Sequence, residues 1–109
     1  MTDIKYPLQG VHVVEMASAV AAPVSARLLS SFGAEVIKIE TPPRGDILRP
    51  MAAAQAKCTV NEQNPVFDFS NSGKKVIALN LKSEEGMRIF HELLSWADVF
   101  VTNVRYHSL

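Results

Sequence analysis

Residues 11–40 read VHVVEMASAVAAPVSARLLSSFGAEVIKIE, and this succession of patterns decides the fold class. The opening run, 11–16, is rich in β-branched residues and predicts a strand. A helix is predicted next, between Pro23, which suits a first turn, and Gly33, which suits a helix end. Its apolar positions recur at helical spacing, at Val24, Leu28, Leu29 and Phe32. Residues 35–40 then alternate polar and apolar side chains, which predicts a strand with one wetter face.

Residues 75–102 repeat this plan. A strand is predicted over 75–81, and Ser83 is suited to cap a helix whose first turn carries Glu84 and Glu85. That helix has one apolar stripe, formed by Met87, Phe90, Leu93, Leu94 and Ala97. Residues 98–102 predict the next strand. Strands that alternate with helices predict an α/β fold, in which a Rossmann-like parallel sheet is joined by right-handed crossover helices.

The two units are separated by a long connection, residues 41–72, which is rich in Pro, Gly, Asn and Gln. A connection of this length inside a compact domain is more often functional than idle. The chain ends at 106–109, shortly after a predicted strand and without a closing helix. We therefore expect residues 1–109 to form the N-terminal portion of a larger domain that is incomplete at its C-terminus.

Composition excludes several classes of function. The chain of 109 residues has 11 Lys and Arg against 11 Asp and Glu, so a nucleic-acid or membrane-surface partner is not indicated. No apolar stretch approaches the ~20 residues of a membrane span. Cys58 is the single cysteine, which suits a reducing cytoplasm, and no His neighbours it as a nucleophile's partner would.

Metal and nucleotide motifs are also missing from the sequence. His12, His91 and His107 are scattered without metal-ligand spacing, so we expect no metal. His12 is expected to point outward from its strand, and Trp96 is expected to serve in packing. Neither a G-x-G-x-x-G nor a P-loop sequence is present.

Ligands of open parallel sheets bind at the carboxyl ends of the strands, so the residues that follow each strand are candidates for a site. Residues 17–22 are nearly all small, which suits either a ligand lying against backbone N–H groups or tight helix packing. Arg44, Lys82 and Arg105 follow the later strands and could surround one phosphate-bearing ligand. The alternative is that these three cations are solvated surface side chains.

Four blocks of sequence resemble the family III CoA-transferases, of the CaiB/BaiF type, in the same order. They are PLQGVHVVE at 7–15, GAEVIKIE at 33–40, NSGKK at 71–75 continued by LNLKSEEG at 79–86, and ADVFVTN at 97–103. The resemblance covers nearly the whole chain. The sequence of residues 79–84 and of Thr102-Asn103 is similar to sequences of the family branch that handles aryl-lactates and 2-hydroxyisocaproate.

This resemblance implies transfer of CoA from an acyl-CoA thioester to a free carboxylic acid through an enzyme acyl anhydride, without metal. The nucleophile of the family is an Asp that is expected beyond the end of this chain. None of Asp3, Asp46, Asp68 or Asp98 matches it, so no catalytic residue is assigned and the chain alone is expected to be inactive. The resemblance also implies an interlocked homodimer when full length, and the lone cysteine favours a cytoplasmic location.

The resemblance further implies part of a site for coenzyme A. The positions that match it are Ala19, Val20, Ala21, Thr41, Leu79, Lys82, Asn103 and Val104. The chain departs from the family at Thr41, where a basic residue is frequent, and at 104–107. Two alternatives remain open: a 2-methylacyl-CoA racemase or epimerase of the same family, and a non-catalytic CoA-binding fragment.

Overall fold

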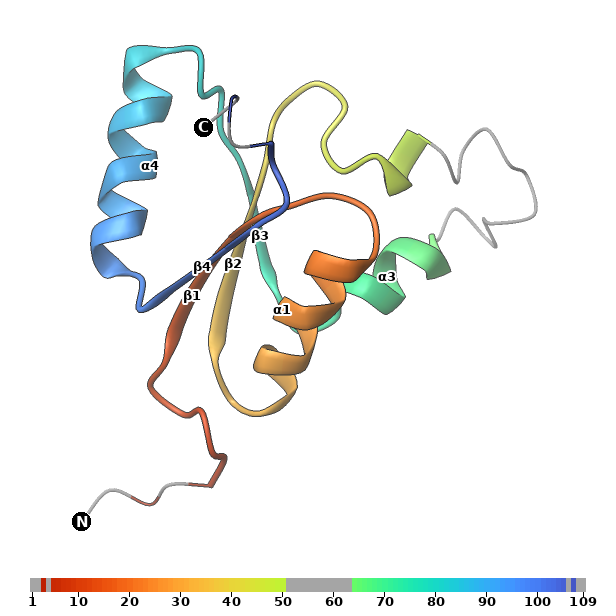
Figure 1. Ribbon diagram of the computed structural model, residues 1–109, viewed down its shortest axis with the longest axis vertical. Coiled ribbons are helices and arrows are strands. Elements are labelled where there is room, and N and C mark those ends of the chain that lie inside the picture. Colours follow the sequence, from red (N-terminus) through yellow and green to blue (C-terminus); the bar gives the residue numbers. More distant parts are fainter. Residues whose placement is uncertain (1–2, 4, 51–63, 106, 108–109) are drawn as a thin grey trace.

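The computed structural model of the protein describes residues 3, 5–50, 64–105 and 107, and within them it contains one parallel sheet of four strands (Figure 1). The strands lie in the order β3-β2-β1-β4. Their bounds are β1 His12–Met16, β2 Glu35–Glu40, β3 Lys75–Ala78 and β4 Val99–Thr102. All three neighbouring pairs are parallel. The predicted α/β class with a parallel sheet is therefore confirmed.

Helices cover both faces of this sheet. Helices α1 (Ala21–Ser31) and α3 (Pro65–Asn71) lie together on one side, and α4 (Glu84–Trp96) lies on the other (Figure 1). We call these the α1–α3 face and the α4 face. Side chains alternate along a strand, so the neighbours Val13 and Val14 of β1 belong to opposite faces. The result is a three-layer arrangement with a separate apolar cluster on each side of the sheet.

The α4 face matches its sequence pattern closely. The Ser83 hydroxyl accepts a hydrogen bond of 3.0 Å from the Gly86 N–H, as a helix cap does. Phe90 and Leu93 pack on a buried cluster formed by Val14, Ile39 and Leu79. Met87 departs from the predicted stripe because it is exposed at the first turn, and Ile89 packs on the cluster although it was not predicted to. This helix packs by its long apolar side chains.

Helix α1 uses a different surface from the predicted one. Leu28 and Phe32 are about half exposed, at 48% and 52%, whereas Pro23 and Ala26 are buried. Leu29 alone among the long predicted side chains packs on the cluster of Val13, Ala26, Ala34 and Val36. Small residues bring the helix backbone close to the sheet, so the predicted stripe was only partly correct.

The prediction of a wetter face on β2 was wrong. Lys38 and Glu40 are buried on the α1–α3 face, together with Val36. Alternation of polar and apolar residues usually marks a solvated face, but here α1 and α3 cover it, and the charges are paired by Glu15 of β1 and by Asp46 and Arg49 after β2. The sequence pattern could not distinguish a solvated lysine from a buried and paired one.

The long connection 41–72 contains a helix that the sequence analysis read as irregular. Helix α3 begins after Asn64, whose side-chain oxygen accepts a 3.0 Å hydrogen bond from the Phe67 N–H. Pro65 occupies the first helical position, where its missing N–H costs nothing. The Asn-Pro pair was the available signal, and a helix of seven residues gave too little periodicity to see. Cys58 lies outside the described residues.

His12 does not point into solvent as expected. Its ring stacks on Trp96 with centroids 4.1 Å apart, on the α4 face. Trp96 also packs against the apolar cluster there, so its predicted packing role is confirmed. None of the described helices has the length and apolar character needed to cross a membrane.

Candidate functional site

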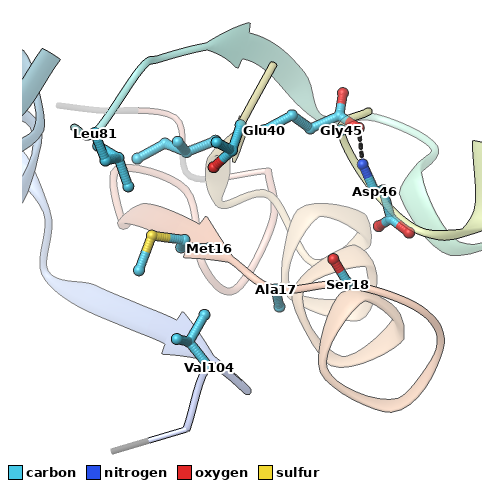
Figure 2. A pocket seen from close by; sticks show the side chains of 10 residues that line it. Met16, Ala17, Ser18, Glu40, Gly45, Asp46, Leu81 and Val104 are labelled. Atoms are coloured by element: carbon cyan, nitrogen blue, oxygen red, sulfur yellow. Dashed lines mark hydrogen bonds between the residues drawn. The ribbon is translucent and has the colours of Figure 1, made fainter. Parts of the chain in front are cut away.

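A cleft of about 220 Å³ lies at the carboxyl edge of the sheet, where residues that end or follow all four strands meet (Figure 2). One wall is apolar, and the other carries hydroxyl and carboxylate groups. This location is the one that ligands of open parallel sheets use. The lining residues are Met16, Ala17, Ser18, Ile39, Glu40, Thr41, Gly45, Asp46, Leu81 and Val104.

The ends of β1 and β4 are tied together beyond the last backbone pair. The Thr102 hydroxyl donates a 2.7 Å hydrogen bond to the Met16 carbonyl. The Asn103 side chain accepts from the Ser18 N–H at 3.1 Å and donates to the Ser18 carbonyl at 2.8 Å. Both residues are joined to partners 85 or 86 positions away in sequence. The Ser18 side of the cleft is thereby fixed to the β4 side.

The loop between β1 and α1 contains the one described residue other than glycine with a left-handed backbone, Ala19, at φ 68°. Its N–H donates a 3.1 Å hydrogen bond to Oδ1 of Asp46. A non-glycine residue in this region is strained by roughly 1–3 kcal/mol and persists only where its surroundings hold it. Such strain clusters at ligand sites.

The loop after β2 folds around the carboxylate of Glu40. Glu40 Oε1 accepts a 2.6 Å hydrogen bond from the Asp46 N–H (Figure 2). Arg49 donates to both oxygens of the same carboxylate at 2.8 and 2.9 Å. Gly45 has φ 68°, and a Cβ there would lie 2.6 Å from Glu40 Oε1. This tight turn therefore requires glycine. It places Asp46 beside the β1–α1 loop.

A row of buried charges runs beneath the cleft on the α1–α3 face. Lys38 lies 2.6 Å from a Glu15 oxygen and 2.8 Å from Oδ2 of Asp46, and Lys74 pairs with the other oxygen of Glu15. All four side chains are fully buried. The two ammonium groups balance the two carboxylates, so the row, which we call the charged row, is neutral overall.

Lys74 connects the charged row to both helices of its face. Its ammonium donates to the Pro23 carbonyl in α1 at 2.8 Å and to the Ser70 carbonyl in α3 at 3.0 Å. It also donates to the Asn71 side chain at 2.8 Å. An ammonium has three donors, and here each is directed at an acceptor inside the fold. Lys74 therefore joins α1, α3 and β1 in one polar junction.

The ionisation of the row follows from its surroundings. Burial acts to raise the pKa of Asp46, but hydrogen bonds from Lys38 and two backbone N–H groups outweigh it, so the pKa is lowered. At Glu40, burial also acts to raise the pKa, but the hydrogen bonds from Arg49 and the Asp46 N–H outweigh it, so the pKa of Glu40 is lowered. Burial lowers the pKa of Lys74, against the opposing effect of Glu15. Both carboxyls are thus kept ionised near neutral pH.

The structure brings some of the predicted coenzyme positions together and places others elsewhere. Thr41 and Val104 line the cleft. Ala19, Val20 and Ala21 form the neighbouring loop and the start of α1. Lys82 is exposed next to Leu81, which lines the cleft. Asn103 has its side-chain amide engaged by Ser18, and Leu79 is buried in the core of the α4 face.

The three predicted cations share one edge of the sheet. Arg44, Lys82 and Arg105 follow β2, β3 and β4, which are parallel, and all three side chains are exposed. Exposed cations at one edge are compatible with a phosphate-bearing ligand as well as with solvation. Their role as a phosphate site stays a prediction.

The sequence analysis missed the charged row completely. One signal was available, because Glu15 follows two valines in the run 11–16, and Lys38 stands between two isoleucines in the run 35–40. Glu15 and Lys38 are register partners across β1 and β2, as two such runs in adjacent parallel strands can be. Lys74 and Asp46 gave no comparable signal, since both stand in polar segments. Among the described residues, no group of three or more His, Cys, Asp or Glu side chains could hold a metal ion.

Known proteins resemble this chain in both sequence and structure. A family model described as CoA-transferase family III matches residues 8–109. The chain is 49% identical over 102 residues to (R)-2-hydroxy-4-methylpentanoate CoA-transferase of Clostridioides difficile, covering 94% of this chain and 25% of that protein. It is 47% identical over 100 residues to cinnamoyl-CoA:phenyllactate CoA-transferase of Clostridium sporogenes, covering 92% and 24%. The chain thus spans about a quarter of the length of these relatives.

Solved structures agree with the sequence comparisons. The crystal structure of a CAIB/BAIF family protein from Brucella suis superposes with a TM-score of 0.82 at 31% identity, over 95% of this chain and 27% of that one. A mutant of Rv3272 from Mycobacterium tuberculosis gives 0.80 at 30% identity, over 94% and 26%. The family match spans both predicted units and all four strands, so this chain belongs to CoA-transferase family III.

Proposed function

We propose that this chain forms part of the coenzyme A site of an enzyme that moves CoA from an acyl-CoA thioester to a free carboxylic acid. The observation that carries the proposal is the cleft at the carboxyl edge of a parallel sheet, in a chain that belongs to CoA-transferase family III. Thr41 and Val104, two of the positions implied by the resemblance, line that cleft. Residues 1–109 would be the N-terminal portion of its larger Rossmann-like domain.

The proposed chemistry is an exchange between a thioester and a carboxylate. An enzyme carboxylate attacks the thioester carbonyl, forming a mixed anhydride and releasing CoA thiolate. The thiolate then attacks the anhydride at the enzyme's own carbonyl, which gives an enzyme thioester and frees the first acid. The acceptor carboxylate attacks this thioester and releases the thiolate again, leaving an anhydride between acceptor and enzyme. Attack of the thiolate on the acceptor's carbonyl yields the new acyl-CoA and restores the enzyme carboxylate.

The identity of the acids is proposed from the relatives. Proteins named for (R)-2-hydroxy-4-methylpentanoate and for phenyllactate are 49% and 47% identical to this chain. Both names describe 2-hydroxy acids with a bulky apolar side chain. We infer a substrate of that class. These relatives are named as transferases, which favours transfer over the racemase alternative.

We further propose that the complete enzyme is a cytoplasmic homodimer. Val99 and Phe100 leave apolar surface exposed on the edge strand β4, and Val76 does so on the opposite edge strand β3. Unpaired sheet edges favour association or continuation of the sheet. Sedimentation of the full-length protein at several concentrations would test the dimer.

Activity is tested most directly in a chimera. The part of the Clostridioides difficile relative that matches this chain, about a quarter of that protein, is replaced by the matching residues of this chain. We expect the chimera to transfer CoA to a branched 2-hydroxy acid, whereas the 109-residue chain alone does not. Exchange catalysed by the isolated chain would contradict the expectation that its nucleophile lies elsewhere. A folded chimera that binds no acyl-CoA would contradict the proposed function.

Lys82→Ala in that chimera tests the phosphate contact. Lys82 stands just before Ser83, the cap of α4, where a phosphate would meet both the ammonium and the helix N-terminus. The phosphates of CoA are remote from the reacting carbonyl, so the change should raise KM and leave kcat nearly unchanged. A charge-assisted contact predicts a rise of about 10- to 100-fold at low salt.

The control for Lys82 is Lys75→Ala. Lys75 is an equally charged, exposed residue at the start of β3, on the opposite edge of the sheet, where it pairs with Glu35 at 2.6 Å. We expect its KM to match that of the parent. Equal KM values for the two variants would mean that Lys82 is a solvated surface lysine. Lys82→Arg should recover part of the loss.

A further inference from the structure

Asp46 lies where three parts of the fold meet. Its Oδ1 accepts hydrogen bonds from the Ala19 N–H at 3.1 Å and from the Leu48 N–H at 2.9 Å. Its Oδ2 lies 2.8 Å from the ammonium of Lys38. The side chain is fully buried, yet the residue also forms part of the cleft wall (Figure 2). One carboxylate therefore joins the β1–α1 loop, the loop after β2 and the charged row.

The β1–α1 loop needs such a tether because of Ala19. At φ 68° the alanine occupies a region that disfavours any residue with a Cβ. The neighbouring Ala17 carbonyl accepts a 3.0 Å hydrogen bond from Lys38, so the charged row holds the loop on both sides of Ser18. Both of these contacts depend on the Lys38–Asp46 pair. Without the pair, the loop would keep the Asn103 contacts of Ser18 but lose the hydrogen bond made by Ala19 itself.

A buried charged row is a costly way to fill a core. Apolar residues of similar volume usually serve stability as well or better, whereas removal of one partner leaves an unpaired buried charge. Stability alone therefore does not explain the charged row. The row ends at the cleft, beside the strained turn at Ala19, and this location indicates that its charges fix the positions of the loops there.

We propose that Asp46 is a positioning residue of the coenzyme A site, which locks Ala19 in its left-handed turn and so sets the wall that the β1–α1 loop presents to the ligand. This inference rests on the proposed function. Asp46 acts through backbone N–H groups and does not itself contact the ligand. The role requires a carboxylate, since three donors converge on its two oxygens. An amide would direct its NH₂ group at one of them.

The test compares Asp46→Asn with a matched control, Glu92→Gln, in the chimera described above. Glu92 is exposed on α4 and loses the same charge. Calorimetric titration with CoA gives the affinity, and residue-resolved amide hydrogen exchange reports the two loops. We expect Asp46→Asn to weaken CoA binding about tenfold and to accelerate exchange at Ala19 and Leu48 by a similar factor. Glu92→Gln should change neither.

The outcomes separate the two proposals. Failure of the folded parent chimera to bind CoA overturns the proposed site, while exchange at Ala19 still decides whether Asp46 holds the loop. A folded Asp46→Asn protein with unaltered affinity, or with unaltered exchange at Ala19, overturns the positioning role. Faster exchange spread evenly over all four strands indicates a merely structural residue and also overturns it.

A second pair of variants keeps the test valid should Asp46→Asn fail to fold. Ala19→Gly and Ala19→Val leave every charge in place. Glycine adopts a positive φ freely, whereas a β-branched side chain is a poor fit there. We expect Ala19→Val to bind CoA about tenfold more weakly than Ala19→Gly, because only the valine is strained at this φ. Equal affinity of the two variants overturns the proposal.

Discussion

On the α4 face the sheet is packed by Val14, Ile39 and Leu79, whereas on the α1–α3 face the apolar cluster gives way to the buried charges of Glu15 and Lys38 toward the cleft. The two arrangements alternate along single strands, since Val14 and Glu15 are neighbours in β1. Apolar contacts stabilise without direction, and hydrogen-bonded charges stabilise only in one geometry. The comparison indicates that apolar contacts on the α4 face mainly stabilise the fold, whereas the buried charges on the α1–α3 face mainly fix the positions of the loops at the cleft.

The largest effect should come from Glu15→Gln. Glu15 is the carboxylate shared by Lys38 and Lys74, so its loss leaves two buried ammonium groups without their common partner. We expect the free energy of unfolding to fall by about 3–5 kcal/mol, measured by urea denaturation. Glu84→Gln, an exposed change on α4 with the same loss of charge, should leave the midpoint nearly unaltered. A loss for Glu15→Gln as small as that of this control would remove the basis for treating the two faces as different.

The matching change on the α4 face is Ile39→Ala. Ile39 is 3% exposed in β2, next to Lys38 but on the opposite face. Truncation leaves a cavity and should cost about 2–5 kcal/mol, with Ile39→Val costing only about 0.5–1.5 kcal/mol. The loss should be the same at low and high salt. A strongly salt-dependent loss would show that the α4 face also relies on charges.

Lowering the pH should reduce the free energy of unfolding through the buried carboxylates of the α1–α3 face. The pKa values of Asp46 and Glu40 are lowered, so the folded state holds these carboxyls ionised at a pH where the unfolded chain, with pKa values near 4, takes up protons. Their stabilisation is therefore complete above about pH 5 and is lost as the pH falls through the lower folded values. Urea denaturation from pH 7 to pH 3 should show this fall. Asp46→Asn should flatten it, and an unchanged slope in that variant would contradict the assignment.

The smallest effect is expected from Ser83→Ala. The Ser83 hydroxyl caps α4 through the Gly86 N–H, and its removal should cost about 1 kcal/mol of unfolding free energy. Ser83→Asp should retain the cap. Thermal denaturation followed by circular dichroism would measure both variants, and a loss for the aspartate equal to that for the alanine would argue against capping.

Sequence reasoning succeeded where a residue's environment is dictated by its neighbours in the chain. The strands, α4, its cap at Ser83 and the parallel direction of the strands all followed from local patterns. It failed where tertiary partners decide. Lys38 resembles a solvated residue until Glu15 and Asp46 are seen beside it, and Leu28 resembles a core residue until Ala26 takes its place against the sheet.

In the candidate site, too, some residues could be predicted from the sequence and others could not. Thr41 and Val104 came from the resemblance and lie in the cleft, as strand topology also suggested for the residues after each strand. Asp46 was considered only as a catalytic aspartate and set aside. Its actual partners are Ala19, Leu48 and Lys38, which stand 27, 2 and 8 positions away, and no spacing rule in the sequence links them.

Asn103 extends the pairing of β1 and β4 with its side chain in place of its backbone. Its amide accepts one hydrogen bond from the Ser18 N–H and donates another to the Ser18 carbonyl, as the backbone of a further paired residue would. An amide donates and accepts from two separate atoms, whereas a carboxylate has no proton to give. This contact extends the order of the sheet into the residues that line the cleft. Ordering a free loop costs about 1–2 kcal/mol per residue, and here folding has already met that cost. A ligand that enters between Ser18 and Val104 therefore retains more of its contact energy as affinity.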